Sequence, residues 1–112
     1  TQALNPYFAL NYLRWGMTLD FERKFEAAKP FMEKANHLDP NGYFVLAHVG
    51  WHWVQLASHE ERQGQYAKAR EYYHESIKWF DQSQLLNYDQ NTVGRRYKEI
   101  VKQRLVELGE KK

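Results

Sequence analysis

Two short stretches carry the pattern that decides the fold of this chain: residues 12–19 read YLRWGMTL, and residues 46–53 read LAHVGWHW. Gly16 in the first stretch and Gly50 in the second occupy equivalent places, each directly after a large apolar residue. The spacing from Gly16 to Gly50, which we call the short offset, also separates Pro6 from Pro40. Because self-similarity at a fixed period is the signature of a repeat architecture, the sequence predicts stacked copies of one structural unit.

The rest of the unit repeats with a longer spacing, which we call the long offset. The matched pairs are Phe25 and Tyr66, Ala28 and Ala69, Met32 and Tyr73, Ala35 and Ser76, and Leu38 and Trp79. The long offset exceeds the short one by about two helical turns, so the same face of the helix still points inward. We therefore expect the first helix of the second unit to be about two turns longer than its counterpart.

Each unit contains two helical patterns. In the first, Tyr12, Trp15, Gly16 and Leu19 share one side of a helix, at positions i, i+3, i+4 and i+7. Gly16 lacks a side chain where we expect the second helix to come close. Pro40 and Gly42 end the second helix, because proline disfavours helical geometry before it and glycine suits a tight turn.

A last helical pattern follows the second unit. Its apolar stripe consists of Val93, Tyr97, Ile100, Val101, Leu105 and Leu108. Stacked repeats leave an apolar edge open, and a terminal helix with a polar outer face closes it. We expect residues 92–108 to form this capping helix, packed on the second helix of the second unit. The basic residues Arg95, Arg96, Lys98 and Lys102 are expected on its solvated face.

The composition is that of one folded domain. The chain has 112 residues, of which 43% are hydrophobic, with four Trp, eight Tyr and six Phe, and this is enough for a packed core. The absence of cysteine excludes disulfides and thiolate metal sites. The net charge of +2 is too small to indicate nucleic-acid binding, and no apolar run approaches the roughly 20 residues that span a bilayer. We expect no nucleic-acid partner, no membrane insertion and no signal peptide, and a domain excised from a longer protein.

These patterns resemble the tetratricopeptide repeat family. That family places a large residue, Leu-Gly and Tyr on the first helix, then Ala, Phe and Ala on the second, before a closing Pro. The matching residues are Tyr12, Trp15, Gly16, Leu19, Ala28, Met32, Ala35 and Pro40 in the first unit, and Leu46, Val49, Gly50, Trp53, Gly64, Tyr66, Ala69, Tyr73 and Ser76 in the second. Residues 63–69, QGQYAKA, are similar to the family's turn between helices.

The resemblance covers residues 5–80. It implies an all-α fold of two antiparallel helix pairs plus the cap, in a single domain over residues 1–112, with repeat 1 at 5–40 and repeat 2 at 41–82. Three departures leave the curvature of the stack open: Trp15 replaces the usual Leu, the first helix of the second unit is too long by about two turns, and Asp81 stands where a Pro is expected.

The resemblance also implies a function, because the first helix of each pair lines a concave binding face in this family. Carried over position by position, the face consists of Leu10, Leu13, Arg14, Met17 and Phe21 from the first unit, and Ala47, His48, Trp51, Val54 and Gln55 from the second. Such an apolar and aromatic groove suits an amphipathic helix or an apolar peptide. The chain is therefore expected to be a non-catalytic scaffold that binds a protein or peptide partner.

Two alternatives stay open for this groove: it is covered by the rest of the same protein, or by a second copy in a homodimer. The subfamily that grips a C-terminal carboxylate has Lys and Asn at groove positions. Leu13, Met17, Ala47 and Trp51 stand there in this chain, so that binding mode is excluded.

The histidines raise the question of a metal or catalytic site. His48 and His52 have a spacing that can bind a metal on a helix, and His59, Glu60 and Glu61 lie about two turns later. Nothing resembles a His-Glu-x-x-His arrangement, and no nucleophile, base and orienting group come together in the sequence. We expect no cofactor, no metal and no catalysis. His48 is expected in the groove, and His52 hydrogen-bonded against the second helix.

A second resemblance suggests another function. Residues 43–55 and 97–105 are similar to the C-terminal repeat tails of bacterial membrane O-antigen ligase-like proteins. This resemblance implies a regulatory or structural appendage of a larger membrane-embedded enzyme, located in the periplasm. The compartment is otherwise open, with the cytoplasm as the other possibility.

Overall fold

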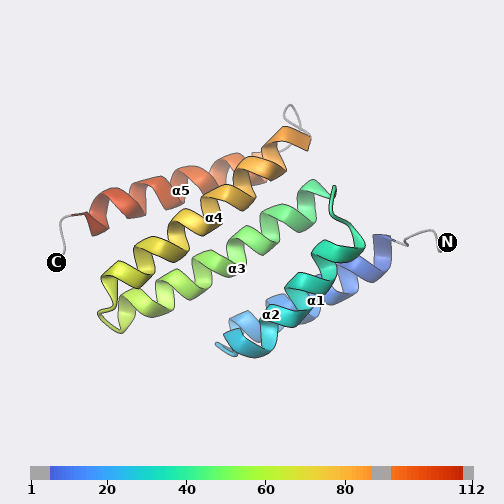
Figure 1. Cartoon of the computed structure of the whole chain (residues 1–112), viewed down its shortest axis with the longest axis horizontal. Helices are drawn as coiled ribbons and strands as arrows, with labels where there is room; N and C mark the ends of the chain where they lie inside the picture. Colours follow the sequence, from blue (N-terminus) through green and yellow to red (C-terminus); the bar gives the residue numbers. More distant parts are fainter. Residues whose placement is uncertain (1–5, 87–91, 110–112) are drawn as a thin grey trace.

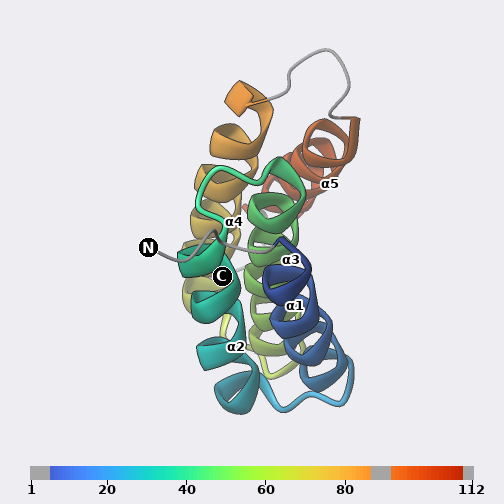
Figure 2. The same cartoon turned by 90° about the vertical axis from the view of Figure 1, so that its right-hand side faces the viewer.

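The computed structural model describes the backbone of residues 6–86 and 92–109, with side chains for 8–85 and 95–109. These residues form five α-helices and no strand, which confirms the predicted all-α fold. The helices are α1 (Pro6–Phe21), α2 (Phe25–Leu38), α3 (Tyr43–Arg62), α4 (Tyr66–Leu86) and α5 (Thr92–Leu108). Figure 1 shows α1 and α2 as one pair, and α3 and α4 as a second pair with α5 along it. In Figure 2, α1, α3 and α5 lie on one side of the molecule, and α2 and α4 on the other.

The turns inside the two pairs have the same geometry. At the end of α1, the Lys24 N–H donates to the Leu19 carbonyl oxygen at 2.8 Å, and at the end of α3 the Gln65 N–H donates to Glu60 at 2.9 Å. Each bond runs from residue i to residue i−5, as in a Schellman motif, and the long offset relates one bond to the other. The two units are therefore equivalent in the backbone hydrogen bonds of their turns as well as in their side-chain pattern.

The left-handed residue of each turn is where the two units differ. This residue is Gly64 in the second turn, with φ of 78°, and Arg23 in the first, with φ of 64°. A glycine adopts this conformation without strain, whereas a residue with a Cβ approaches its own carbonyl oxygen there. The first turn therefore stores backbone strain that the second avoids.

Substitution of Arg23→Gly should raise the free energy of unfolding by roughly 0.5–1 kcal/mol, because it removes left-handed strain at the cost of some unfolded-state entropy. Chemical denaturation measures this change. Arg23→Ala is the matched control and should leave stability nearly unchanged, while Gly64→Ala should lower it by about 1 kcal/mol. A destabilised Arg23→Gly variant would contradict this account of the turn.

Close helix packing explains the two glycines of the repeat. A Cβ on Gly16 would lie 2.9 Å from Met32 Cε of α2, and a Cβ on Gly50 would lie 2.6 Å from Phe80 Cε1 of α4. Both distances are too short for a side chain, so the expectation that Gly16 admits a second helix is confirmed, and Gly50 does the same. Phe80 is fully buried by this contact.

The second pair is longer than the first in both of its helices. α3 has 20 residues and α4 has 21, against 16 in α1 and 14 in α2. The prediction placed the whole extension in the first helix and ended the unit at residue 82, but α4 continues to Leu86. The last turn of α4 lies against the start of α3, where the Ser83 hydroxyl donates a hydrogen bond to the Tyr43 carbonyl oxygen at 2.6 Å.

Helix α5 packs on α4 and also on α3. Val101 and Leu108 are buried in one cluster with Phe80 and Tyr73 of α4 and with Ala57 of α3. Lys98 pairs with Asp81 at 2.6 Å, and Arg104 pairs with Glu61 of α3. Ile100, a member of the predicted buried stripe, is 49% exposed, and the Val93 side chain lies outside the described residues.

Replacing Leu108→Ala should lower the free energy of unfolding by roughly 2–4 kcal/mol, because it leaves a cavity between α5 and the second pair. Ile100→Ala removes a half-exposed side chain from the same helix and should cost less than about 1 kcal/mol. Thermal and urea unfolding of the two variants give the comparison. Equal losses would mean that α5 is not held by its buried stripe.

Candidate functional site

Two stripes of side chains follow the outer face of α1 and α3 in register. The stripe on α1 consists of Leu10, Arg14, Met17 and Phe21, and the stripe on α3 consists of Phe44, His48, Trp51 and Gln55. Within each stripe the residues stand at i, i+4, i+7 and i+11, which places them on one side of the helix. The short offset relates the two stripes at every position, so both belong to the same face of the repeat.

Four of the predicted groove residues are buried and do not line an open surface. Leu13 of α1 packs in a cluster with Met32 and Val49, and Val54 of α3 packs in a second cluster toward α4 and α5. Ala47 and His48 are also buried. The reason is that neighbouring helices cover these positions: Leu13 lies against α2 and α3, and Val54 lies against α4 and α5.

The open part of this face is largest on α1. Phe21 is 87% exposed, Met17 is 38% exposed and Arg14 is exposed, while Trp51 and Gln55 of α3 are partly buried. Large apolar side chains exposed in a continuous stripe are typical of interaction surfaces. We call Arg14, Met17, Phe21 and Trp51 the α1–α3 face.

The sequence prediction missed one exposed aromatic residue at the end of this face. Phe44 is 44% exposed, and the short offset applied to Leu10 identifies it. Leu10, Phe44 and Val45 line a hollow of about 390 Å³ between α1 and the start of α3. The apolar surface therefore continues into a depression at one end.

Helix α5 covers part of the stripe on α3. The Tyr97 ring lies 4.5 Å from the ring of Trp51, centroid to centroid, and meets the His48 ring at 6.4 Å in an edge-on arrangement. The Phe44 ring also packs against His48, at 4.2 Å between ring centroids. Trp51 is thus a shared residue, which contacts α5 and remains partly open at the α1–α3 face.

Burial controls the electrostatics of His48. Its removal from water lowers the pKa below the ordinary 6.5, and this outweighs the hydrogen bond to the Phe44 carbonyl oxygen at 2.8 Å, which raises the pKa. The folded state therefore binds fewer protons at this site than the unfolded state once the pH falls to about 6.5. Above that pH, the burial of neutral His48 does not reduce the free energy of unfolding. As the pH falls below it, the unfolded state takes up a proton more readily than the folded state, and the free energy of unfolding decreases.

Between pH 7 and 5.5 we expect the free energy of unfolding to decrease, and we expect His48→Gln to make this decrease smaller. Urea titrations at several pH values measure the slope. His37→Gln, on the exposed side of α2, is the matched control and should keep the wild-type slope. An unchanged slope in His48→Gln would show that another group carries the pH dependence.

The second histidine of the candidate metal pair links the two helix pairs. His52 Nδ1 lies 2.8 Å from both carboxylate oxygens of Asp20 on α1, and both residues are buried. His52 is therefore hydrogen-bonded as expected, but its partner belongs to the first helix of the other unit. Desolvation raises the pKa of Asp20 and outweighs the lowering by the hydrogen bond to His52 and by its charge.

The remaining candidate ligands also have structural roles. The His59 ring packs against Phe25 at 5.2 Å, and the Glu61 carboxylate accepts hydrogen bonds from Tyr73 at 3.0 Å and from Arg104. Burial and the Glu61 carboxylate raise the pKa of Tyr73 to about 12. Within the described ranges, no three His, Cys, Asp or Glu side chains are grouped as a metal site.

Comparison with known proteins identifies the first helix pair. Residues 9–41 match the family model described as tetratricopeptide repeat, and this range covers α2 and most of α1. The predicted resemblance to the tetratricopeptide repeat family is therefore confirmed for the first helix pair. Comparisons with curated proteins and with solved structures found no match. None of the helices in the described part of the chain is long and apolar enough to cross a membrane.

Proposed function

Because residues 9–41 match the tetratricopeptide repeat family model, we propose that this chain is a non-catalytic scaffold that binds a partner helix or apolar peptide on the α1–α3 face. Tetratricopeptide repeats generally mediate protein–protein interaction. Stacked repeats present an extended face made by equivalent helices, and a ligand that contacts several repeats at once buries more surface than one repeat offers.

The observation that carries this proposal is the pair of stripes held in register by the short offset. Met17 and Phe21 are exposed on α1, and Trp51 lies partly buried on α3, at the position equivalent to Met17. An exposed phenylalanine and methionine gain free energy when a partner removes them from water, by roughly 1.5–3 kcal/mol for a fully buried side chain. Arg14 is the charged member of the face, which favours a partner with an acidic residue beside its apolar stripe.

An amphipathic helix suits this surface best. Its apolar residues recur at the same i, i+4 and i+7 spacing as the stripes, so three of them can contact Met17, Phe21 and Trp51 in succession. The hollow beside Phe44 accepts one further side chain at the end of the groove. An apolar peptide in extended form would contact the same residues with a period of two.

A displayed library of amphipathic helices, selected on the purified chain, supplies the probes for a test. Binders should lose at least about tenfold in affinity with Met17→Glu or Phe21→Glu, because a hot-spot residue is typically worth about 2 kcal/mol or more. Val106→Glu is the matched control, since Val106 is a 65% exposed apolar residue on α5, and binding should persist. Calorimetry or fluorescence anisotropy gives the affinities.

Two results would contradict the proposal: a selection without binders, or binders that tolerate both α1 substitutions. Size-exclusion chromatography of the same variants separates the homodimer alternative. A second copy on the α1–α3 face would make wild type dimeric and Phe21→Glu monomeric.

The alternative from sequence, an appendage of a larger O-antigen ligase-like enzyme, stays a prediction. The parent reading frame decides it, because many apolar spans before Thr1 would favour that function. Catalysis in this chain is not part of either proposal.

A further inference from the structure

A cleft separates the two helix pairs on the side away from the α1–α3 face. No described Cα atom of α2 comes within 8 Å of a Cα atom of α4, so these equivalent helices of the two units leave a gap. The gap forms a cavity of about 150 Å³ over α3. A space of this size holds one benzene-sized group.

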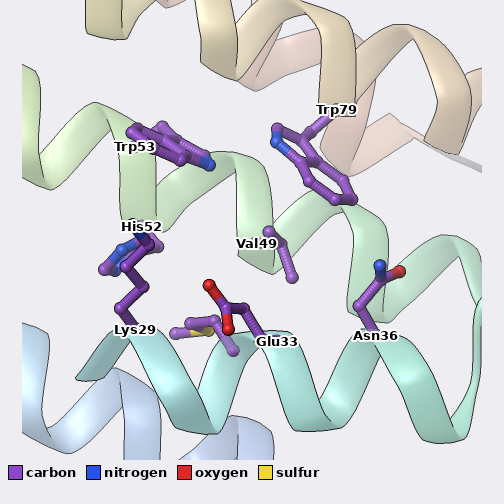
Figure 3. A pocket seen from close by; sticks show the side chains of 8 residues that line it. Lys29, Glu33, Asn36, Val49, His52, Trp53 and Trp79 are labelled. Carbon is purple, nitrogen blue, oxygen red and sulfur yellow. The ribbon is translucent and has the colours of Figure 1, made fainter. Parts of the chain in front are cut away.

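Two tryptophans form the aromatic wall of the cleft. Trp53 of α3 and Trp79 of α4 line it together with Met32 and Val49, which form its apolar floor. Figure 3 shows the two indole nitrogens facing each other across the gap. Neither indole N–H has a hydrogen-bond partner among the described residues, so both can donate to a ligand.

The opposite wall carries a carboxylate. Glu33 of α2 lines the cleft, is exposed, and has no ion pair within the described residues. Figure 3 shows its carboxylate extending from α2 into the space below the tryptophans. Lys29, one turn earlier, also lines the cleft but forms no ion pair with Glu33.

Acidic side chains continue beyond Trp53. A second hollow shares this ring and is lined by Glu71, Tyr72 and Glu75 of α4. Glu75 pairs with Lys78 at 3.4 Å, while Glu71 has no ion pair in the part of the chain that the structure describes. Among the described residues that line the two hollows, three are carboxylates and one, Lys29, is an ammonium.

A buried histidine at the cleft adds a polar ring nitrogen. His52 lines the cavity and is 2% exposed, and its Nε2 has no hydrogen-bond partner among the described residues. The other ring nitrogen, Nδ1, lies 2.8 Å from both carboxylate oxygens of Asp20. A buried polar atom without a hydrogen-bond partner is unfavourable, and a ligand that hydrogen-bonds to Nε2 relieves this cost.

We propose that this cleft binds an arginine side chain from a basic segment of a partner protein. The planar guanidinium stacks on an indole ring, its N–H groups donate to the Glu33 carboxylate, and its methylene stem lies on Met32 and Val49. The two indole N–H groups donate to main-chain carbonyl oxygens of the same segment. A second basic residue of the segment would meet Glu71. This site lies on a different surface from the α1–α3 face and does not depend on it.

A blocked Gly-Arg-Gly peptide tests the proposal, with Gly-citrulline-Gly as the uncharged control of the same shape. Titration into the isotopically labelled chain should shift the indole N–H signals of Trp53 and Trp79 in a proton–nitrogen correlation spectrum, and citrulline should bind at least about fivefold more weakly. Glu33→Gln should weaken the arginine peptide about tenfold, because it removes a charged acceptor. Lys29→Met should strengthen binding, because it removes the competing cation.

The variants distinguish the occupants. Equal binding of the arginine and citrulline peptides, or an unchanged affinity in Glu33→Gln, overturns the proposal in favour of an apolar group, which Gly-Phe-Gly would reveal. Weaker binding after Lys29→Met overturns it in favour of an anion. Glu33 and Lys29 are exposed, so both variants should keep the helical circular dichroism spectrum. Met17→Glu should leave the arginine peptide unaffected, which separates this site from the proposed groove.

Discussion

The ring of Phe80 lies directly on the backbone of α3, at the one residue of that turn without a side chain. A Cβ at Gly50 would come within 2.6 Å of the ring, so glycine is required for this distance between α3 and α4. Phe80 in turn contacts Tyr97, at 5.7 Å between ring centroids, and this contact places α5. The arrangement of α3, α4 and α5 thus depends on the absence of a side chain at Gly50.

The two helix pairs are joined more sparsely than each pair is joined internally. α1 and α2 both contact α3, but α2 and α4 stay apart, and the buried Asp20–His52 hydrogen bond is a polar link that ties α1 to α3. Burying a carboxylate is costly unless it is hydrogen-bonded, so this pair fixes one register between the units. The separation of α2 from α4 leaves the cleft beside Trp53 and Trp79, on the side opposite the α1–α3 face.

The two proposed sites follow from this geometry in different ways. The α1–α3 face is a regular property of the repeat, because equivalent positions on equivalent helices point the same way. The cleft is an irregular property, because it exists where two equivalent helices, α2 and α4, fail to meet. An apolar partner suits the first surface, and the carboxylates of Glu33 and Glu71, which form no ion pair within the described residues, suit a basic partner at the second.

The sequence by itself determined the helices, their pairing and the presence of a last helix, because these depend on local spacing and on the short and long offsets. It also located the glycine contacts and the stripe of Met17 and Phe21. Only the tertiary structure decided which of the predicted groove and cap residues stay open. Leu13 and Val54 are buried, and Ile100 is exposed. Exposure depends on the angle at which the neighbouring helix crosses, and the periodicity of one helix does not determine this crossing angle. The partner of His52 and the cleft at Trp79 also arise between units, where side chains distant in sequence meet.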